Sequence, residues 1–170
     1  NSIQFLADEE RAHAKRGRKA GLQAVRRAFY GGDLAARIVR HHQEIGGLLR
    51  AEDLAGYRVR IEPPCRVRFG GDVEVFTGGP WGQGPVMLEA LNILDDLDLA
   101  VMGHNSTEYI HAAIEAIKLA AADREAYFGD PLFVDVPIEA LLSKEHAEAR
   151  RRMIRADEAW PEVPPAAEVA

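Results

Sequence analysis

Hydrophobic residues recur at three- and four-residue intervals over residues 21–40, a spacing typical of amphipathic helices. The pair Gly31-Gly32 interrupts this pattern, so we expect two helices, the second beginning at Leu34 with Asp33 as its N-cap. The glycines at 46 and 47 are expected to end the second helix. The apolar positions that set the period are Leu22, Val25, Phe29, Leu34 and Ile38.

The period changes in the middle of the chain. Apolar and charged residues alternate one by one over residues 57–62, which predicts a half-buried strand that ends at Pro63-Pro64. Two further alternating segments, at 67–69 and 73–75, flank the glycine-containing turn 70–72. This arrangement predicts an antiparallel hairpin.

The second half of the chain returns to the helical period. A helix is expected to begin at Pro85, which suits a first turn, and to stop near Asp95, because acidic residues oppose the dipole at a helix C-terminus. A longer helix is expected to open at Asn105, with Glu108 three residues on, and to continue to Phe128. A last, strongly charged helix is expected over 143–155.

Residues 161–170 are rich in proline and acidic residues and show no periodicity, which indicates an extended tail. The fold class that these patterns predict is α+β, mostly helical with one small antiparallel sheet.

Length and composition narrow the class of protein. The 170 residues suit one domain, and 47% hydrophobic with 28% charged residues excludes a wholly disordered chain. The net charge of −6 does not favour nucleic acid as the main partner. The basic run within residues 8–20 lacks interleaved aromatic residues, so we interpret it as a solvated helix face or loop.

Cysteine content and hydropathy exclude two further classes. The single cysteine, Cys65, cannot form an internal disulfide, leaves the compartment open, and is expected to be a small buried residue. No apolar run approaches the roughly 18 to 20 residues of a membrane-spanning helix. We therefore predict no membrane span.

The six histidines do not form a recognisable metal-binding motif. His41 and His42 are adjacent and point to different helix faces, whereas His111 and Glu115 lie one turn apart and share a face without a third ligand. No HExxH motif is present, so the sequence predicts no metal site. The histidines are His13, His41, His42, His104, His111 and His146.

The glycine-rich segment 78–84 lies between a predicted strand and a predicted helix, where anion-binding loops occur. It matches neither GxGxxG nor the P-loop motif, so a nucleotide is not expected. Trp81 offers a stacking surface, and Gln83 offers both donors and an acceptor beside Gly84. Two interpretations stay open: a tight turn that packs against the fold, which is favoured, or part of the wall of a substrate pocket.

The densest polar group comprises Asp123, Arg124, Tyr127 and Asp130. A buried carboxylate pair for acid–base chemistry is one interpretation. Ion pairs that cap the loop 129–131 are the favoured one. Spacing alone reveals no catalytic constellation.

Five stretches, in this order, resemble the large subunit of γ-glutamyltranspeptidases and together span most of residues 29–150. They are FYGGDLA at 29–35, GGLL followed by EDLAGY within 46–57, GPVMLEALNIL at 84–94, HAAIEAIK at 111–118 and ADREAYFGDP at 122–131.

The resemblance implies an N-terminal-nucleophile hydrolase of the αββα fold, made as a precursor that cuts itself into a large and a small subunit. In that family the new N-terminal threonine of the small subunit attacks a γ-glutamyl amide, and neither a metal nor an organic cofactor is needed. The nucleophile and the oxyanion donors lie in the small subunit. We therefore expect no catalytic residue in this chain, and we expect its partners to be the small subunit and a γ-glutamyl substrate.

By this resemblance, residues 1–160 are the C-terminal part of a large subunit, and 161–170 are an accessible, mobile tail upstream of the processing site. If the loop 79–84 approaches the substrate pocket, Trp81, Gln83 and Gly84 are the candidates for its wall. The loop 79–84 departs from the proline- and serine-containing stretch of the familiar transpeptidases, so an acylase acting on glutaryl-cephalosporins or poly-glutamate is an alternative. A non-catalytic scaffold of the same fold is another. Family members are commonly exported, which favours a periplasmic or extracellular location while leaving the cytoplasm open.

Overall fold

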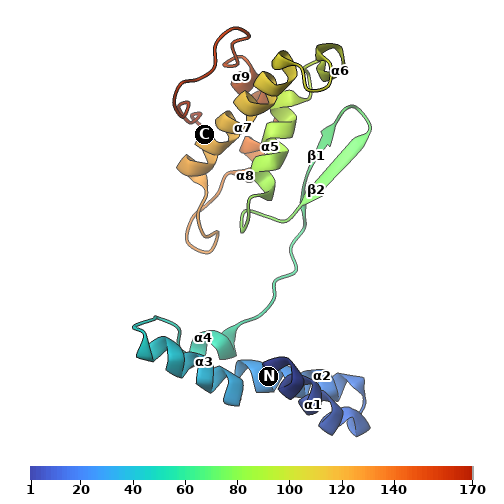
Figure 1. Ribbon diagram of the computed structural model, residues 1–170, viewed down its shortest axis with the longest axis vertical. Coiled ribbons are helices and arrows are strands. Elements are labelled where there is room, and N and C mark those ends of the chain that lie inside the picture. Colours follow the sequence, from blue (N-terminus) through green and yellow to red (C-terminus); the bar gives the residue numbers. More distant parts are fainter. Residues whose placement is uncertain (170) are drawn as a thin grey trace. The chain divides into compact units, whose positions relative to one another are not determined.

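A computed structural model describes residues 1–169, and in it the chain forms two compact units rather than the single domain suggested by its length. The first unit comprises residues 1–60 and the second begins at Ile61. Each has its own set of helices (Figure 1). Ala170, the last residue of the expected tail, lies outside the described residues.

The first unit is entirely helical over its regular segments. A break at Gly17, whose φ of 93° lies in the left-handed region, separates the first two helices. The charged run predicted to be a solvated face spans this break and is largely exposed. The elements are α1 (Ser2–His13), the 3₁₀ turn η1 (Ala14–Arg16), α2 (Arg18–Tyr30), α3 (Asp33–Glu44) and α4 (Ala51–Gly56).

The two-helix prediction for residues 21–40 is confirmed, with one correction at the cap. Gly32 is the N-cap of α3 and Asp33 is already its first helical residue, so Asp33 does not serve as the cap. Ala28 lies so close to Gly32 that an added Cβ would stand 3.0 Å from it. The expected stop is confirmed, because α3 ends at Glu44 and Gly46 follows with a φ of 75°.

The strand predicted over residues 57–62 does not form. Its apolar side chains are exposed, with Val59 at 71% and Ile61 at 100%, and no described strand lies beside it. A strand needs a neighbour for its backbone hydrogen bonds, and Pro63-Pro64 separates this segment from the hairpin that follows. The alternating pattern therefore predicts a strand, but residues 1–169 provide no second strand that pairs with it.

The predicted hairpin is confirmed, with β1 (Cys65–Phe69) antiparallel to β2 (Val73–Thr77). Val67 pairs with Val75 across the two strands. Gly70 and Gly71 both have positive φ, a backbone conformation that favours glycine. Cys65, expected to be buried, is only half-buried at the start of β1.

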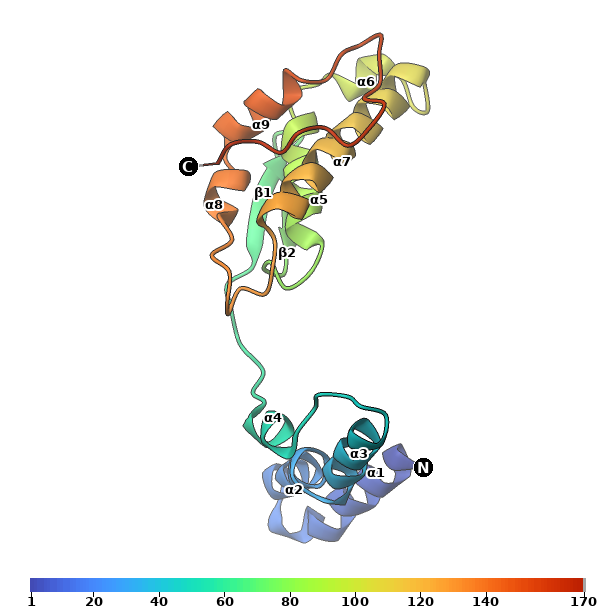
Figure 2. The same cartoon turned by 90° about the vertical axis from the view of Figure 1, so that its left-hand side faces the viewer.

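The second unit packs two helices side by side, α5 and α7, against which α9 also lies (Figures 1 and 2). Ile93, Ala116 and Leu119 are fully buried between them and form the core cluster. The helices are α5 (Gly84–Leu94), α6 (Leu99–Met102), α7 (Thr107–Tyr127), α8 (Ile138–Leu141) and α9 (Lys144–Arg151).

The helical predictions for this unit need small corrections. Asn105 has a φ of 59° and is not part of α7, whose N-cap is Ser106. The side chain of Ser106 accepts a hydrogen bond from the Tyr109 N–H. The last helix ends at Arg151 rather than at residue 155. The short helices α6 and α8 have no predicted counterpart, because neither is long enough to show a period.

The acidic residues that end α5 are neutralised by α9. The Arg151 side chain donates to the carbonyl of Ile93 at 2.7 Å and pairs with Asp96 at 2.8 Å. Lys144 lies 2.6 Å from Asp95. These contacts satisfy free carbonyls at the helix C-terminus and offset the unfavourable charge there. Among residues 1–169, no helix is both long and apolar enough to cross a membrane.

Candidate functional site

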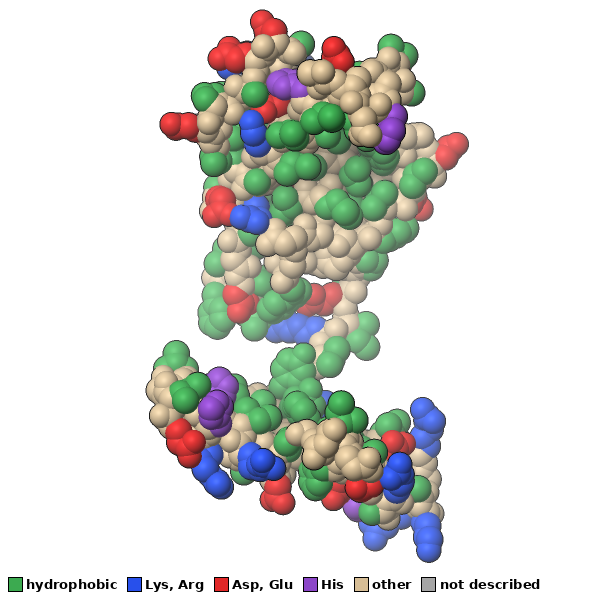
Figure 3. All heavy atoms as spheres, viewed as in Figure 1, with side chains coloured by type: hydrophobic (Ala, Val, Ile, Leu, Met, Phe, Trp, Pro, Cys, Tyr) green, Lys and Arg blue, Asp and Glu red, His purple; other side chains and the backbone are tan. Residues whose placement is uncertain are grey.

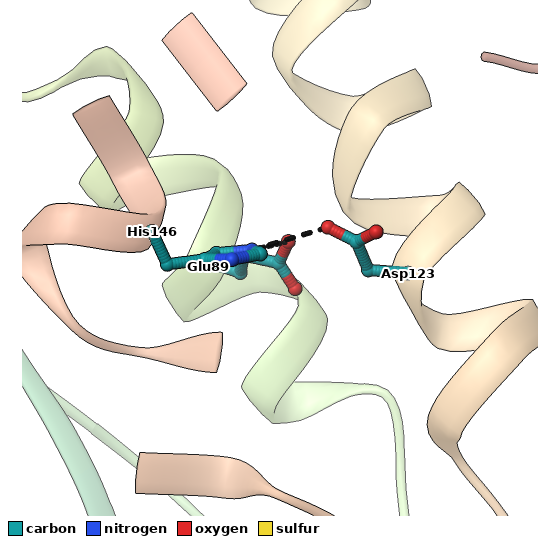
Figure 4. Close-up of side chains that lie close together, drawn as sticks. All are labelled: Glu89, Asp123 and His146. Carbon is teal, nitrogen blue, oxygen red and sulfur yellow. Dashed lines mark hydrogen bonds and ion pairs between the residues drawn. The ribbon is translucent and has the colours of Figure 1, made fainter. Parts of the chain in front are cut away.

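Three side chains from three helices converge in the interior of the second unit. Glu89 comes from α5, Asp123 from α7 and His146 from α9, and they point toward one another (Figure 4). The Nε2 atom of His146 lies 3.1 Å from an oxygen of Glu89 and 3.1 Å from an oxygen of Asp123. Both carboxyl side chains are fully buried.

A buried arginine completes this group. The Nε atom of Arg150 lies 2.9 Å from Asp123 Oδ2, and its Nη2 donates to the carbonyl of Leu119 at 2.9 Å. The contact at Nε has the distance of an ion pair without the alignment of a hydrogen bond. One oxygen of Glu89, Oε2, is buried without a hydrogen-bond partner. We call Glu89, Asp123, His146 and Arg150 the buried cluster.

The surroundings move three pKa values in this cluster. Burial raises the pKa of Glu89 to about 8, against the opposing hydrogen bond from His146. Burial opposes the charge on His146, but its hydrogen bonds to Asp123 and Glu89 outweigh that effect and raise its pKa to about 9. Burial also disfavours the Asp123 carboxylate, yet its hydrogen bonds and the Arg150 charge hold its pKa below the usual value.

Within residues 1–169, Glu89, Asp123 and His146 are the one set of three such residues whose potential ligand atoms lie within 4.8 Å of one another. A cation there would have to compete with the Arg150 guanidinium for Asp123. It would also have to displace protons from Glu89 and His146, whose raised pKa values favour the protonated forms. The arrangement therefore suits a shared proton better than a metal ion.

The loop predicted to be either a turn or a pocket wall contacts the C-terminal part of α7. Gln83 accepts a hydrogen bond from Arg124 at 2.9 Å, and the Trp81 indole donates to Glu62 at 2.9 Å. A Cβ on Gly84 would lie 1.7 Å from the Thr77 hydroxyl, so helix and strand approach closely there. A shallow pocket of about 260 Å³ separates the loop from α7; it is lined by Pro80, Trp81, Gly82, Gln83, Arg124, Glu125, Phe128 and Gly129.

The structure separates the polar group predicted around Asp123. Asp123 belongs to the buried cluster and pairs with Arg150, whereas Arg124 faces the loop at Gln83. Tyr127 bonds to the C-terminal segment through its hydroxyl. Asp130 caps its own turn by accepting from the Leu132 N–H at 2.9 Å, as the ion-pair and loop-capping interpretation expected.

His111 and Glu115, considered above as a ligand pair, each bind another part of the chain. The His111 ring lies 2.6 Å from the carbonyl of Arg155, and Glu115 accepts from the backbone N–H of Trp160 at 3.1 Å. His41 and His42 contact each other edge to face. None of these histidines joins the buried cluster.

Sequence reasoning missed the buried cluster. Its members are separated by 57 residues between Glu89 and His146, and by 23 between Asp123 and His146, so no local motif marks them. One signal was available: Glu89 interrupts the apolar stripe of α5 between Leu88 and Ala90, both buried. A charge inside an apolar stripe indicates a buried polar contact.

Comparison with known proteins points to one family. The family model described as gamma-glutamyltranspeptidase matches residues 10–169. The glutathione hydrolase-like YwrD proenzyme of Bacillus subtilis is 38% identical over 143 residues, which cover 84% of this chain and 26% of that protein. The chain spans about a quarter of the length of the first curated relatives it matches.

Solved structures agree with this similarity. The crystal structure of Helicobacter pylori gamma-glutamyltranspeptidase matches with a TM-score of 0.77 and 31% identity, covering 84% of this chain and 42% of that one. A cephalosporin acylase from Bacillus halodurans matches with a TM-score of 0.70 and 37% identity, covering 84% and 26%. The predicted fold class, mostly helical with a small antiparallel sheet in an N-terminal-nucleophile hydrolase, is confirmed.

Proposed function

The chain belongs to the gamma-glutamyltranspeptidase family, and from this premise we propose that it is part of the large subunit of a self-processing enzyme that cleaves γ-glutamyl amides. The observation that carries the proposal is the family match over residues 10–169, nearly the whole chain. The similarity to relatives described as proenzymes supports a precursor that is cut.

The proposed reaction is acyl transfer at a threonine that cleavage exposes in the small subunit. The threonine Oγ attacks the carbonyl carbon of the γ-glutamyl amide, and its proton passes to the threonine's own α-amine. The C–N bond then breaks, and the departing amine takes that proton. Water or an acceptor amine attacks the resulting ester, which releases glutamate or a new γ-glutamyl amide and restores the threonine.

This chain would contribute the structural surroundings of that nucleophile and no catalytic residue. On α7, Ile110, Ile114 and Ile117 form an exposed apolar stripe, with 44%, 47% and 58% of each residue exposed. Hydrophobic side chains gather on the face of the second unit that Figure 3 turns toward the viewer. Such a stripe on a helix is expected to pack against further protein, and the small subunit of the same precursor is the partner we propose.

The loop at Trp81, Gln83 and Gly84 is proposed as part of the wall of the substrate pocket. Trp81 is 49% exposed and lines the shallow pocket, so its aromatic ring forms part of the pocket wall. Arg124, held by Gln83 and paired with Glu125, adds guanidinium N–H donors at the same place. A wall with an aromatic ring and guanidinium donors suits a substrate that carries a carboxylate.

A related acylase is the second candidate. The similarity to a cephalosporin acylase, at 37% identity, favours it, as does the departure of the loop 79–84 from the stretch found in the familiar transpeptidases. A γ-glutamyl anilide and a glutaryl anilide differ by the α-amino group alone. The ratio of kcat/KM for the two substrates therefore separates the candidates.

Intact mass spectrometry of the purified full-length gene product, with N-terminal sequencing of each species, tests the proposal. We expect two fragments, the smaller beginning with threonine, and hydrolysis of a γ-glutamyl anilide by the pair. A single uncut chain without activity contradicts the proposal and leaves the non-catalytic scaffold as the function.

A further inference from the structure

The segment that follows α9 is extended, as predicted, but it is not loose. Residues 155–169, which we call the strap, run beside α7 in the same direction along the chain (Figure 2). The strap contains no helix or strand, so it cannot satisfy its own backbone groups. Its position therefore depends on side chains of the helices.

The first half of the strap is held at two places along α7. The His111 ring lies 2.6 Å from the carbonyl of Arg155. At Trp160, the backbone N–H donates to Glu115 at 3.1 Å and the carbonyl accepts from Lys118 at 2.8 Å. Both backbone groups of Trp160 are thus paired with charged side chains.

The second half is held more closely. Asp123 Oδ1 accepts from the Ala167 N–H at 2.7 Å. The Tyr127 hydroxyl donates to the Ala167 carbonyl at 2.5 Å and accepts from the Val169 N–H at 3.1 Å. Three backbone groups of Ala167 and Val169 are therefore fixed by two side chains, one turn apart on α7.

The buried cluster explains why Asp123 can do this. Arg150 and His146 fix the other oxygen of Asp123, Oδ2, at 2.9 and 3.1 Å. Arg150 also donates to the Pro165 carbonyl at 2.9 Å, so the same arginine holds both the carboxylate and the strap. The carboxylate is completely buried and its pKa is lowered, which keeps it an acceptor at neutral pH.

We propose that Asp123 and Tyr127 are positioning residues for maturation, because they fix the strap that leads to the peptide bond cut in the precursor. This inference rests on the proposed function. In maturation the bond before the threonine is hydrolysed: the carbonyl–nitrogen bond breaks, water supplies OH to the new carboxyl group, and hydrogen goes to the new amine. A strap held at Ala167 and Val169 limits the positions of that bond and so raises the fraction of molecules ready to react.

Tyr127→Phe in the full-length precursor is the direct test, because it removes both hydroxyl contacts and keeps the ring. We expect the rate of self-cleavage to fall about tenfold, the change that the net free energy of two weak hydrogen bonds would give. The thermal midpoint should stay close to wild type. The matched control is Tyr109→Phe on the same helix, whose hydroxyl makes none of the strap's hydrogen bonds, and it should cleave at the wild-type rate.

A second pair of variants tests the strap from its own side. Ala167→Pro removes the N–H that donates to Asp123, whereas Glu168→Pro removes an N–H that takes no part in the contacts to Asp123 or Tyr127. We expect Ala167→Pro to slow cleavage and Glu168→Pro to slow it much less. Equal slowing by both would show that local sequence near the cut matters and would overturn the inference.

The readouts separate this inference from the proposed function. A wild-type precursor that does not cleave contradicts the proposed function itself. A wild type that cleaves, with Tyr127→Phe and Ala167→Pro cleaving equally fast, overturns the inference alone. Once cleaved, the Tyr127→Phe enzyme should turn over a γ-glutamyl anilide with the wild-type kcat, because a general loss of structure would lower that value too.

Discussion

The two units of this chain are both built mainly from helices but bury very different side chains. In the second unit, Leu88, Ile93 and Leu119 are completely buried. In the first, the buried apolar residues are Ala24, Ala35 and Val39, all small, and leucines such as Leu22 remain half-exposed. Amphipathic helices alone do not make a core, since a stripe must face a second large apolar surface to be buried.

The ion pairs of the two units also differ in how far they are buried. The pair Arg11–Asp8 in the first unit is exposed on both sides, at 71% and 59%. The pair Arg150–Asp123 in the second unit is buried on both sides. Water screens the charges of the exposed pair but cannot reach those of the buried pair. The same kind of ion pair therefore contributes differently to stability in the two units.

The largest expected effect comes from breaking the buried pair. Arg150→Ala should lower the free energy of unfolding by about 3–5 kcal/mol, because it leaves Asp123 charged without its main partner. Arg11→Ala should cost less than about 1 kcal/mol. Both tryptophans, Trp81 and Trp160, lie in the second unit, so urea denaturation followed by their fluorescence measures that unit. A loss of less than about 1 kcal/mol of unfolding free energy in Arg150→Ala would contradict the expected difference between the buried and the exposed pair.

The next largest loss of stability is expected when a leucine is shortened in each unit. Leu119→Ala should cost about 3 kcal/mol, through lost transfer free energy and the cavity left between α5 and α7. The identical change at Leu22, which is 49% exposed, should cost less than about 1 kcal/mol. The second variant is followed by circular dichroism, since the first unit contains no tryptophan. Similar losses at both positions would mean that the first unit has a core of its own.

Two glycine substitutions, one in each unit, test how closely the backbone is packed. Gly84→Ala should cost about 2 kcal/mol, because the new Cβ would overlap the Thr77 side chain. Gly56→Ala, at the end of α4, meets no atom within 4 Å and should stabilise by about 0.5 kcal/mol. Thermal unfolding of the two variants checks both signs. A neutral Gly84→Ala would show that Thr77 moves aside easily.

The most gradual effect is a pH dependence specific to the buried cluster. Glu89 and His146 have raised pKa values, about 8 and about 9, so the folded state holds protons that the unfolded chain releases. Stability should therefore fall as the pH rises from about 4.5 to about 9. Each group contributes a loss of about 1.4 kcal/mol per pH unit while the pH lies between its unfolded and its folded pKa. The lowered pKa of Asp123 acts in the opposite sense, and only in acid, below its usual value.

The variants His146→Gln and Glu89→Gln isolate this dependence. Each removes one titrating group, so the slope of the free energy of unfolding against pH should flatten in both. Urea denaturation at several pH values provides the measurement. An unchanged slope in His146→Gln would show that the proton is held elsewhere.

Local patterns were sufficient where a structure needs no distant partner. The hairpin was predicted from alternation around Gly70 and Gly71, and Val67 pairs with Val75 as that alternation requires. The helix α5 begins at Gly84, one residue before the predicted start, and Pro85 in its first turn is the single residue whose chemistry indicated it. The strand over 57–62 failed for the converse reason, since its pattern was correct for a strand but no described strand pairs with it.

The sequence did not predict which residues of different helices come together. Asp123 and Arg124 are neighbours in sequence, yet one enters the buried cluster and the other faces the loop at Gln83. Adjacent helical positions point about 100° apart, so adjacency did not indicate a shared role. The pocket-wall role of Trp81, Gln83 and Gly84 stays a prediction.

The sequence by itself determined the helices α2, α3, α5, α7 and α9, the hairpin and the family, because each depends on spacing or on short ordered motifs. Only the tertiary structure decided that Glu89, Asp123, His146 and Arg150 meet, and that the strap lies on α7. Burial gives these contacts their strength, because it removes the water that would otherwise compete for each charge. Burial is a property of the packed helices, which no stretch of sequence specifies alone.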